Sequence, residues 1–318
     1  MKKYVLIPDS FKGTLSSVEI CRIVSREIQA QEPEAEICAI PVADGGEGTV
    51  DAFLAANSGE RITCEVCGPY REPVEGFYGM LEDGTAVIEM AAAAGLPLVG
   101  QNRRADKTTT FGVGQLLLDA LDHGAKKVIM GLGGSCTNEG GVGLAAACGV
   151  KFYDATGAEF LPVGGTLSHI SRIDVSGMNP RIRDVEIVTM CDIDNPLCGV
   201  TGASAIFGPQ KGATPEQVGM LDAGLAHLAA VMKRDLGADV LDLPGGGAAG
   251  GMGAGMVAFF GSRLQMGTQT VLDTAHFDDL VQEADLVFSG EGCFDGQSLH
   301  GKVVVGVASR CKAVHTPL

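Results

Sequence analysis

The chain has 318 residues, of which 46% are hydrophobic and 19% charged, a composition that indicates a globular protein and excludes a disordered one. Its formal net charge of -16 argues against nucleic acid or an anionic membrane as the main partner. The length favours two lobes over one, and 46 glycines predict many tight turns.

The cysteines and the apolar runs predict where the protein resides. Ten cysteines lie mostly inside apolar stretches such as "AAACGV" and "VTMCDI", which is typical of buried thiols in a reducing cytosol. The first apolar run, "YVLI", is too short for a signal peptide and is followed by Pro-Asp. No apolar stretch reaches the length of a bilayer span. We therefore expect a cytoplasmic protein that does not enter a membrane.

The first predicted strand, "YVLIP", runs into the polar stretch "PDSFKGTLSS". Asp9, Ser10 and Lys12 follow the strand, and Ser16 and Glu19 have the spacing of a capping box, so a helix should begin near Ser16. The free N–H groups of that helix start would point back at the loop. Together with Lys12 they predict an anion site, and phosphate is the obvious anion.

Four later apolar runs are also predicted strands, and each ends beside acids, amides and glycines. The side chains of interest after these runs are Asp44 and Glu47, then Asn138, then Asp192 and Asp194, and finally Glu291, Asp295 and Lys302. Helical patterns alternate with the strands, which predicts an α/β protein with a largely parallel sheet.

Open parallel sheets bind ligands at the carboxyl ends of their strands. Asp and Gly are also ordinary turn formers, so any one of these loops has a purely structural interpretation. Five such loops together favour a site in which carboxylates bind Mg²⁺ and orient a hydroxyl for phosphoryl transfer. We expect the acids to converge on one cleft between the lobes, namely Asp9, Asp44, Asp192, Glu291 and Asp295.

Two motifs match nucleotide-binding patterns only in part. "GGGAAG", from Gly245 to Gly250, fits GxGxxG but follows "DVLDLP", which poorly suits the end of a dinucleotide-binding strand. "GQSLHGKV", from Gly296 to Val303, has Val where a P-loop needs Ser or Thr. A true P-loop is therefore not expected, although Lys302 can still face phosphate.

Seven motifs in order, spread over the whole chain, resemble the class I glycerate kinases of bacteria. They are "PDSFKGTLSS", "PVADGGEGT", "KTTTFGVGQLL", "GLGGSCTNEGGVG", "CDIDNPLCG", "AIFGPQKGA" and "DGQSLHGK". The resemblance implies ATP-dependent phosphorylation of D-glycerate, chiefly to 2-phosphoglycerate. It also implies a flavodoxin-like lobe formed by residues 1–78 and 283–318, with a second α/β lobe, residues 79–282, inserted between them.

In the mechanism that we expect, ATP transfers phosphate directly and in line to a glycerate hydroxyl. Asp192 is the first candidate for the catalytic base or a metal ligand and Asp194 the second, while Lys12 holds phosphate oxygens. The substrate-binding candidates are Asp9, Ser10, Asp44, Glu47, Asn138, Arg103 and Lys302, with Arg103 facing the glycerate carboxylate. Glu291 and Asp295 are the candidate ligands of Mg²⁺.

The sequence departs from the family pattern in ways that keep two alternatives open. Cys293 replaces a basic residue, and the chain stops at "AVHTPL", after a predicted helix "VVVGVASRCK", where relatives continue. "AVHTPL" itself reads as a nascent strand. A truncated, impaired protein that only binds ligand is therefore one alternative, and an NAD-dependent oxidoreductase using Gly245–Gly250 is the other. The sequence does not predict an oligomeric state.

Overall fold

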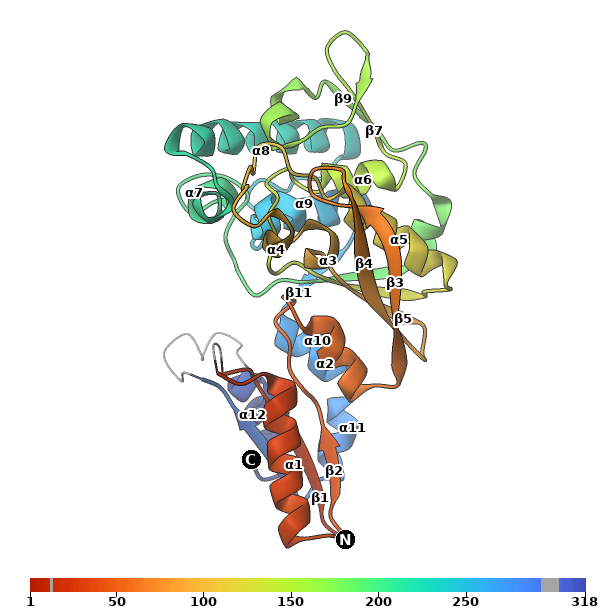
Figure 1. Ribbon diagram of the computed structural model, residues 1–318, viewed down its shortest axis with the longest axis vertical. Coiled ribbons are helices and arrows are strands. Elements are labelled where there is room, and N and C mark those ends of the chain that lie inside the picture. The colour runs from red at the N-terminus through yellow and green to blue at the C-terminus, as the bar shows by residue number, and fades with distance from the viewer. Residues whose placement is uncertain (12–13, 293–302) are drawn as a thin grey trace. The chain divides into compact units, whose positions relative to one another are not determined.

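The structure is a computed structural model that describes residues 1–11, 14–292 and 303–318 (Figure 1). Contacts between residues divide the chain into two compact units. Unit 1 consists of Met1–Asp44, Gly48–Glu60 and Gln265–Leu318, and unit 2 consists of Gly45–Glu47 and Arg61–Leu264. These limits differ from the expected ones at residues 78 and 283.

The shift of the boundaries follows from which elements pack together. Strands β3 (Gly59–Cys67) and β4 (Pro73–Leu81) belong to the large sheet of unit 2. Helices α10 (Gly267–Thr274) and α11 (Phe277–Gln282) contact α12 (Val303–Ala313) in unit 1. Unit 1 therefore takes more of the C-terminal part of the chain than expected and less of the N-terminal part.

Unit 1 contains a three-stranded parallel sheet in the order β12-β1-β2. Its strands are β1 (Lys3–Pro8), β2 (Glu36–Ala39) and β12 (Leu286–Gly290). Central strand β1 is buried along nearly its whole length, as expected for a continuous apolar run between two neighbours. Helices α1 (Ser17–Gln31) and α12 contact β1, and α2 (Thr49–Ala56) contacts α1.

Helix α1 begins where the sequence predicts. The Ser16 side chain accepts a hydrogen bond from the Glu19 N–H, and the Glu19 carboxylate accepts from the Ser16 N–H at 2.9 Å. Both halves of the capping box are thus present, which satisfies donors that the first turn of a helix leaves unpaired.

Unit 2 contains a six-stranded sheet in the order β11-β10-β6-β5-β4-β3. The remaining strands of this sheet are β5 (Thr85–Glu89), β6 (Lys127–Gly131), β10 (Glu186–Met190) and β11 (Arg263–Gln265). Strand β6 pairs in parallel with β5 and β10, whereas β4 and β5 are antiparallel. The carboxyl ends of β6 and β10 therefore lie side by side, and the loops that follow them start at one edge.

Helices pack against this large sheet, and a small antiparallel sheet lies beside α8 (Figure 1). The α-helices are α3 (Ala91–Ala94), α4 (Leu96–Val99), α5 (Phe111–Asp122), α6 (Val142–Ala147), α7 (Ala203–Phe207), α8 (Pro215–Leu236) and α9 (Ala248–Phe260). Short 3₁₀ helices cover Gly164–His169, Pro180–Asp184 and Pro209–Lys211. The small sheet has the order β8-β7-β9, from β7 (Lys151–Tyr153), β8 (Glu159–Phe160) and β9 (Arg172–Asp174).

Two apolar clusters form the core of unit 2. One lies between the large sheet and helices α3 and α5 and includes Tyr78, Ile88, Leu116 and Met130. The other packs α8 and α9 against the small sheet and includes Phe152, which meets the ring of Phe259 edge-on at a centroid distance of 6.0 Å. Apolar burial on this scale fixes the strands whose ends carry the candidate site.

The C-terminal segment is only partly as predicted. "VVVGVASRCK" is helical in α12, which confirms that prediction. The prediction of a strand for "AVHTPL" is wrong, because residues 314–318 form a turn and an irregular end. The Pro317 carbonyl nevertheless accepts a hydrogen bond from the Val287 N–H of β12 at 3.0 Å.

The α/β fold class is confirmed, with parallel strands in the centre of both units. Among the described residues, none of the helices combines the length and the hydropathy that a bilayer span requires.

Candidate active site

In unit 1, the predicted residues Asp9, Ser10 and Glu291 follow neighbouring parallel strands. The Asp9 N–H donates to the Gly290 carbonyl at 2.8 Å, and the Ser10 N–H donates to Asp9 Oδ1 at 2.7 Å. Glu291 comes directly after Gly290, and its Oε1 atom is buried with no hydrogen-bond partner in the described part of the chain. The ends of β1 and β12 thus bring the backbone of Asp9 next to Gly290, the residue before Glu291.

A buried serine ties the segment before Asp44 to the end of β1. Ser17 Oγ donates to the Pro8 carbonyl at 2.6 Å and accepts from the Val42 N–H at 2.8 Å. Asp44 follows two residues later and is exposed. The start of α1 is near the same strand end, and there Glu19 already places one carboxylate beside the helix N-terminus.

In unit 2, Gly45–Glu47 lies over the ends of β6 and β10. The Gly133 N–H donates to the Gly45 carbonyl at 2.8 Å, and a Cβ on Gly45 would lie 3.1 Å from the Cβ of Met190. Gly45 also has φ +83°, which favours glycine there. The short "GGE" segment therefore delivers the exposed Glu47 to the carboxyl ends of two parallel strands.

Asn138 links the loops that follow these two strands. It is fully buried, and its Nδ2 donates to Ser204 Oγ in α7 at 3.0 Å. Asp192 and Asp194 follow β10 in the loop that leads to α7, and both are exposed. Within unit 2 the structure therefore brings together the segments that carry Glu47, Asn138, Asp192 and Asp194.

Arg103 is engaged by backbone groups. Its Nη1 donates to the Gln210 carbonyl at 2.8 Å, and its Nε donates to the Gly100 carbonyl at 3.1 Å. The exposed guanidinium thus holds the 3₁₀ turn Pro209–Lys211 in place. A carboxylate ligand would have to accept hydrogen bonds from the guanidinium N–H groups that do not take part in these two bonds.

Two buried ionisable residues near the loop that follows β6 were not among the predicted site residues: Lys211 was not noticed, and Glu139 was noted only as one of the polar residues after this strand. Lys211 is only 2% exposed, and burial lowers its pKa to about 8. Glu139 is 1% exposed, and burial raises its pKa to about 7, although it accepts hydrogen bonds from Thr110 Oγ1 and the Gly143 N–H. Both residues lie in motifs recognised in the sequence, but the sequence of a motif does not show whether its lysine is buried.

Three predicted site residues lie outside the described residues, namely Lys12, Asp295 and Lys302, as does the "GQSLHGK" motif. Within the described ranges, no three His, Cys, Asp or Glu side chains cluster closely enough to hold a metal by themselves. The expected convergence of Asp9, Asp44, Asp192, Glu291 and Asp295 on one cleft stays a prediction.

The glycine run Gly245–Gly250 does not have the context of a dinucleotide-binding loop. Residues 237–243 before it form turns and irregular chain, where such a loop needs a strand. Gly250 has φ +69°, and a Cβ there would collide with the Thr137 carbonyl oxygen. These glycines let α9 pack against the loop after β6, so the motif has a structural explanation.

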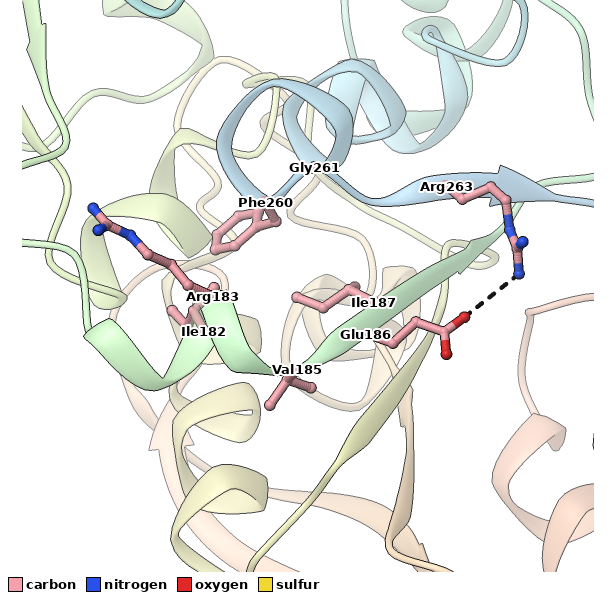
Figure 2. A pocket seen from close by; sticks show the side chains of 8 residues that line it. All are labelled: Ile182, Arg183, Val185, Glu186, Ile187, Phe260, Gly261 and Arg263. Atoms are coloured by element: carbon pink, nitrogen blue, oxygen red, sulfur yellow. Dashed lines mark ion pairs between the residues drawn. The ribbon is translucent and has the colours of Figure 1, made fainter.

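A shallow pocket of about 400 Å³ lies at the opposite end of β10 (Figure 2). Glu186, the first residue of β10, pairs with Arg263 across it at 3.5 Å, and Phe260 and Ile187 form its apolar wall. Because parallel sheets bind ligands at the carboxyl ends of their strands, this pocket is separate from the candidate site.

Comparisons with known proteins show the family of the chain. The glycerate kinase family model matches residues 4–318. A glycerate kinase of Bacillus cereus is 48% identical over 99% of this chain and 84% of its own length. The glycerate 2-kinase of Escherichia coli is 46% identical over the same shares. A solved structure from Salmonella typhimurium, named for glycerate kinase 2, has a TM-score of 0.93 and 45% identity, covering 99% of this chain and 85% of that one.

The strand-end acids and the two-unit α/β fold thus occur in a chain whose relatives are named as kinases. This chain belongs to the glycerate kinase family.

Proposed function

We propose that the protein is a glycerate kinase of the class I type, which transfers the γ-phosphoryl group of ATP to D-glycerate and forms chiefly 2-phosphoglycerate. The observation that carries the proposal is the family match over residues 4–318, supported by 46% identity to a protein named glycerate 2-kinase. The acids at neighbouring strand ends supply the chemistry that this transfer needs.

In the proposed reaction, the C2 hydroxyl oxygen of glycerate attacks the γ-phosphorus as the bond to the β–γ bridging oxygen breaks. The hydroxyl proton passes to a carboxylate, and ADP leaves with the bridging oxygen. We assign the base to Asp192, with Asp194 as the second candidate, because both are exposed beside the loop that Asn138 joins to α7. A carboxylate placed beside the substrate hydroxyl can act as the general base that accepts this proton.

The other assignments divide between the units. Lys12 and the helix start at Ser16 would hold phosphate oxygens, and Lys302 would add a second cation. The residues that would bind the substrate are Asp9, Ser10, Asp44, Glu47 and Asn138. Arg103 would bind the glycerate carboxylate through the N–H groups that are not used on carbonyls.

Glu291 fits the role of a magnesium ligand. Its buried Oε1 atom has no hydrogen-bond donor among the described residues, which suits a carboxylate that meets a cation. Mg²⁺ is commonly held by one or two carboxylates together with substrate phosphates. Glu291 and Asp295 would hold the ion, and when bound it would neutralise charge on the phosphates of ATP.

The proposal is tested by measuring ADP release from ATP, with D-glycerate and with L-glycerate as the matched control. We expect release that needs both D-glycerate and Mg²⁺ and that saturates with each substrate. Absence of turnover despite D-glycerate binding would favour the ligand-binding alternative. Nicotinamide reduction by a hydroxy acid without ATP would instead support an oxidoreductase.

A further inference from the structure

Lys211 is a buried cation in unit 2, at the end of the turn Pro209–Lys211, where it contacts the loop that follows β6. Lysine side chains are seldom fully buried unless they are paired, since removing an ammonium group from water costs free energy. Lys211 nevertheless is only 2% exposed. Its Nζ donates to Ser135 Oγ and to the Thr137 carbonyl, both at 2.7 Å. The ammonium thus holds the loop that follows β6 at two points.

That loop carries polar atoms that are unsatisfied. Thr137 Oγ1 and Asn138 Oδ1 are buried and have no hydrogen-bond partner within the described ranges. A buried polar atom without a partner costs about 1–3 kcal/mol, so native folds rarely keep one without a purpose. The two atoms flank the carbonyl that Lys211 holds, and Asn138 Nδ2 reaches across to Ser204.

The backbone fixes where the ammonium is delivered. The Ala105 N–H donates to the Lys211 carbonyl at 3.2 Å, and Arg103 holds the neighbouring Gln210 carbonyl. Gly212 ends the turn with φ +86°, and a Cβ there would collide with the Arg103 carbonyl oxygen. Contacts with the residues around Arg103 therefore hold the turn Pro209–Lys211 next to the loop after β6.

The positive charge of Lys211 lies among negative charges. The segments at the ends of β6 and β10 carry the exposed acids Glu47, Asp192 and Asp194, and the whole chain carries a formal charge of -16. Such a field repels anions. A positive charge inside the protein is screened by water far less than a surface charge, so it offsets that repulsion effectively.

We propose that Lys211 is a positioning residue for the anionic substrate: it holds the loop Ser135–Asn138 and supplies the buried positive charge beneath it. This inference rests on the proposed function, because the anion in question is glycerate. Lys211 acts through the loop and through its field, and it makes no contact with the reacting atoms.

The charge state of Lys211 supplies the readout. Burial lowers its pKa to about 8, against the weaker opposing effects of Cys136 and Glu139, which are the titratable groups that act on it. The ammonium is therefore mostly charged at pH 7 and mostly neutral at pH 9. Neutral lysine still donates to Ser135 and Thr137, so the loop contacts persist across this range. Glu139, with a pKa of about 7, also loses its proton near pH 7, so the part of the change that is absent in Lys211→Met is the part that reports the charge of Lys211.

The test measures KM for D-glycerate, and kcat, from pH 7 to 9 in the wild type, Lys211→Met, Lys211→Arg and the surface control Lys233→Met. Lys233 lies exposed near the end of α8, and its ammonium group pairs with Asp239, which follows the helix. For the wild type and the control we expect KM to rise several-fold above pH 8. Lys211→Met should raise KM at least tenfold at pH 7 and abolish that rise, and Lys211→Arg should restore part of the affinity without the rise.

A KM for Lys211→Met within twofold of the wild type, or a rise above pH 8 that persists in this variant, would overturn the inference. If Lys211→Met does not fold, the pH profile of the wild type and the KM of Ser135→Ala test the inference instead. Ser135→Ala loses one contact of the ammonium group and should raise KM about threefold. If the wild type lacks kinase activity, the proposed function fails by itself. Calorimetric binding of D-glycerate then replaces KM, and pH-independent binding would overturn the inference too.

Discussion

The loop after β6 in unit 2 and the loops after β1 and β12 in unit 1 carry similar residues but are held differently. Ser135–Glu139 is at most 6% exposed, and its side chains bond to Thr110 just before α5, to Ser204 in α7 and to Lys211. Asp9 and Ser10 are half-buried; the Asp9 N–H donates to the Gly290 carbonyl of the neighbouring strand, and the Ser10 N–H donates to the Asp9 carboxylate. Packing fixes the first loop, and strand pairing fixes the second.

This difference predicts how substitutions separate activity from stability. Changes in the packed loop after β6 should affect both together, because its side chains are part of the core. Changes at the exposed strand-end residues should reduce activity and leave the melt nearly unchanged.

The largest effect is expected for an exposed acid. Asp192→Asn should lower kcat about a thousandfold, since removing a general base commonly costs 10²–10⁴ in rate. Because Asp192 is exposed, the melting temperature should stay close to that of the wild type. Asp194→Asn is the matched control, and we expect a loss of about tenfold. Equal losses in both variants would remove the distinction between base and neighbour.

A pair of glycines at the two ends of α9 tests the packing of the loop after β6. Gly250 (φ +69°) and Gly261 (φ +61°) share the left-handed conformation, but only Gly250 has neighbouring atoms, from Thr137 and Asn138, that a Cβ would strike. Gly261→Ala should cost about 1 kcal/mol for the backbone conformation alone. Gly250→Ala should cost about 3 kcal/mol, measured by denaturant unfolding, since overpacking is added. Equal costs would show that the contact with the loop is unimportant.

Glu139 should make the stability of unit 2 depend on pH. Burial raises its pKa to about 7, above the ordinary 4.5, so the native state holds a proton that the unfolded state releases. The resulting stabilisation is present below pH 4.5 and is lost as the pH rises through 7. Relative to Glu139→Gln, the wild type should lose roughly 2 kcal/mol of unfolding free energy between pH 5 and 8. A constant difference between the two proteins would show that Glu139 is ionised throughout.

Lys12 follows the first strand in unit 1, and its substitution tests the loop that is held by strand pairing. Lys12→Ala should lower kcat/KM at least tenfold, since loss of one phosphate contact costs about 1.4 kcal/mol. Its melting temperature should stay within a degree or so of the wild type, unlike that of Gly250→Ala. Unaltered kinetics would contradict the anion site predicted between the first strand and α1.

The sequence predicts where the strands lie better than it predicts the contacts of the loops that follow them. Apolar runs locate β1, β6, β10 and β12, and the Ser16–Glu19 spacing locates the start of α1, because these signals are local. Placing Gly45–Glu47 with unit 2 depends on the fit of glycines against Met190 and Gly133, which no local pattern encodes. The same holds for Arg103, whose carbonyl partner Gln210 is 107 residues away. The burial of Lys211 likewise results from tertiary contacts.

Phosphorus NMR of the reaction product shows whether this protein transfers phosphate from ATP to the C2 hydroxyl of D-glycerate. With ATP, Mg²⁺ and D-glycerate, we expect ADP and one new phosphomonoester resonance. Without proton decoupling that resonance should be a doublet, because the phosphate oxygen is bonded to a carbon with a single hydrogen. A triplet would place the phosphate on the terminal carbon and contradict the assignment, and no new resonance would contradict the kinase activity itself.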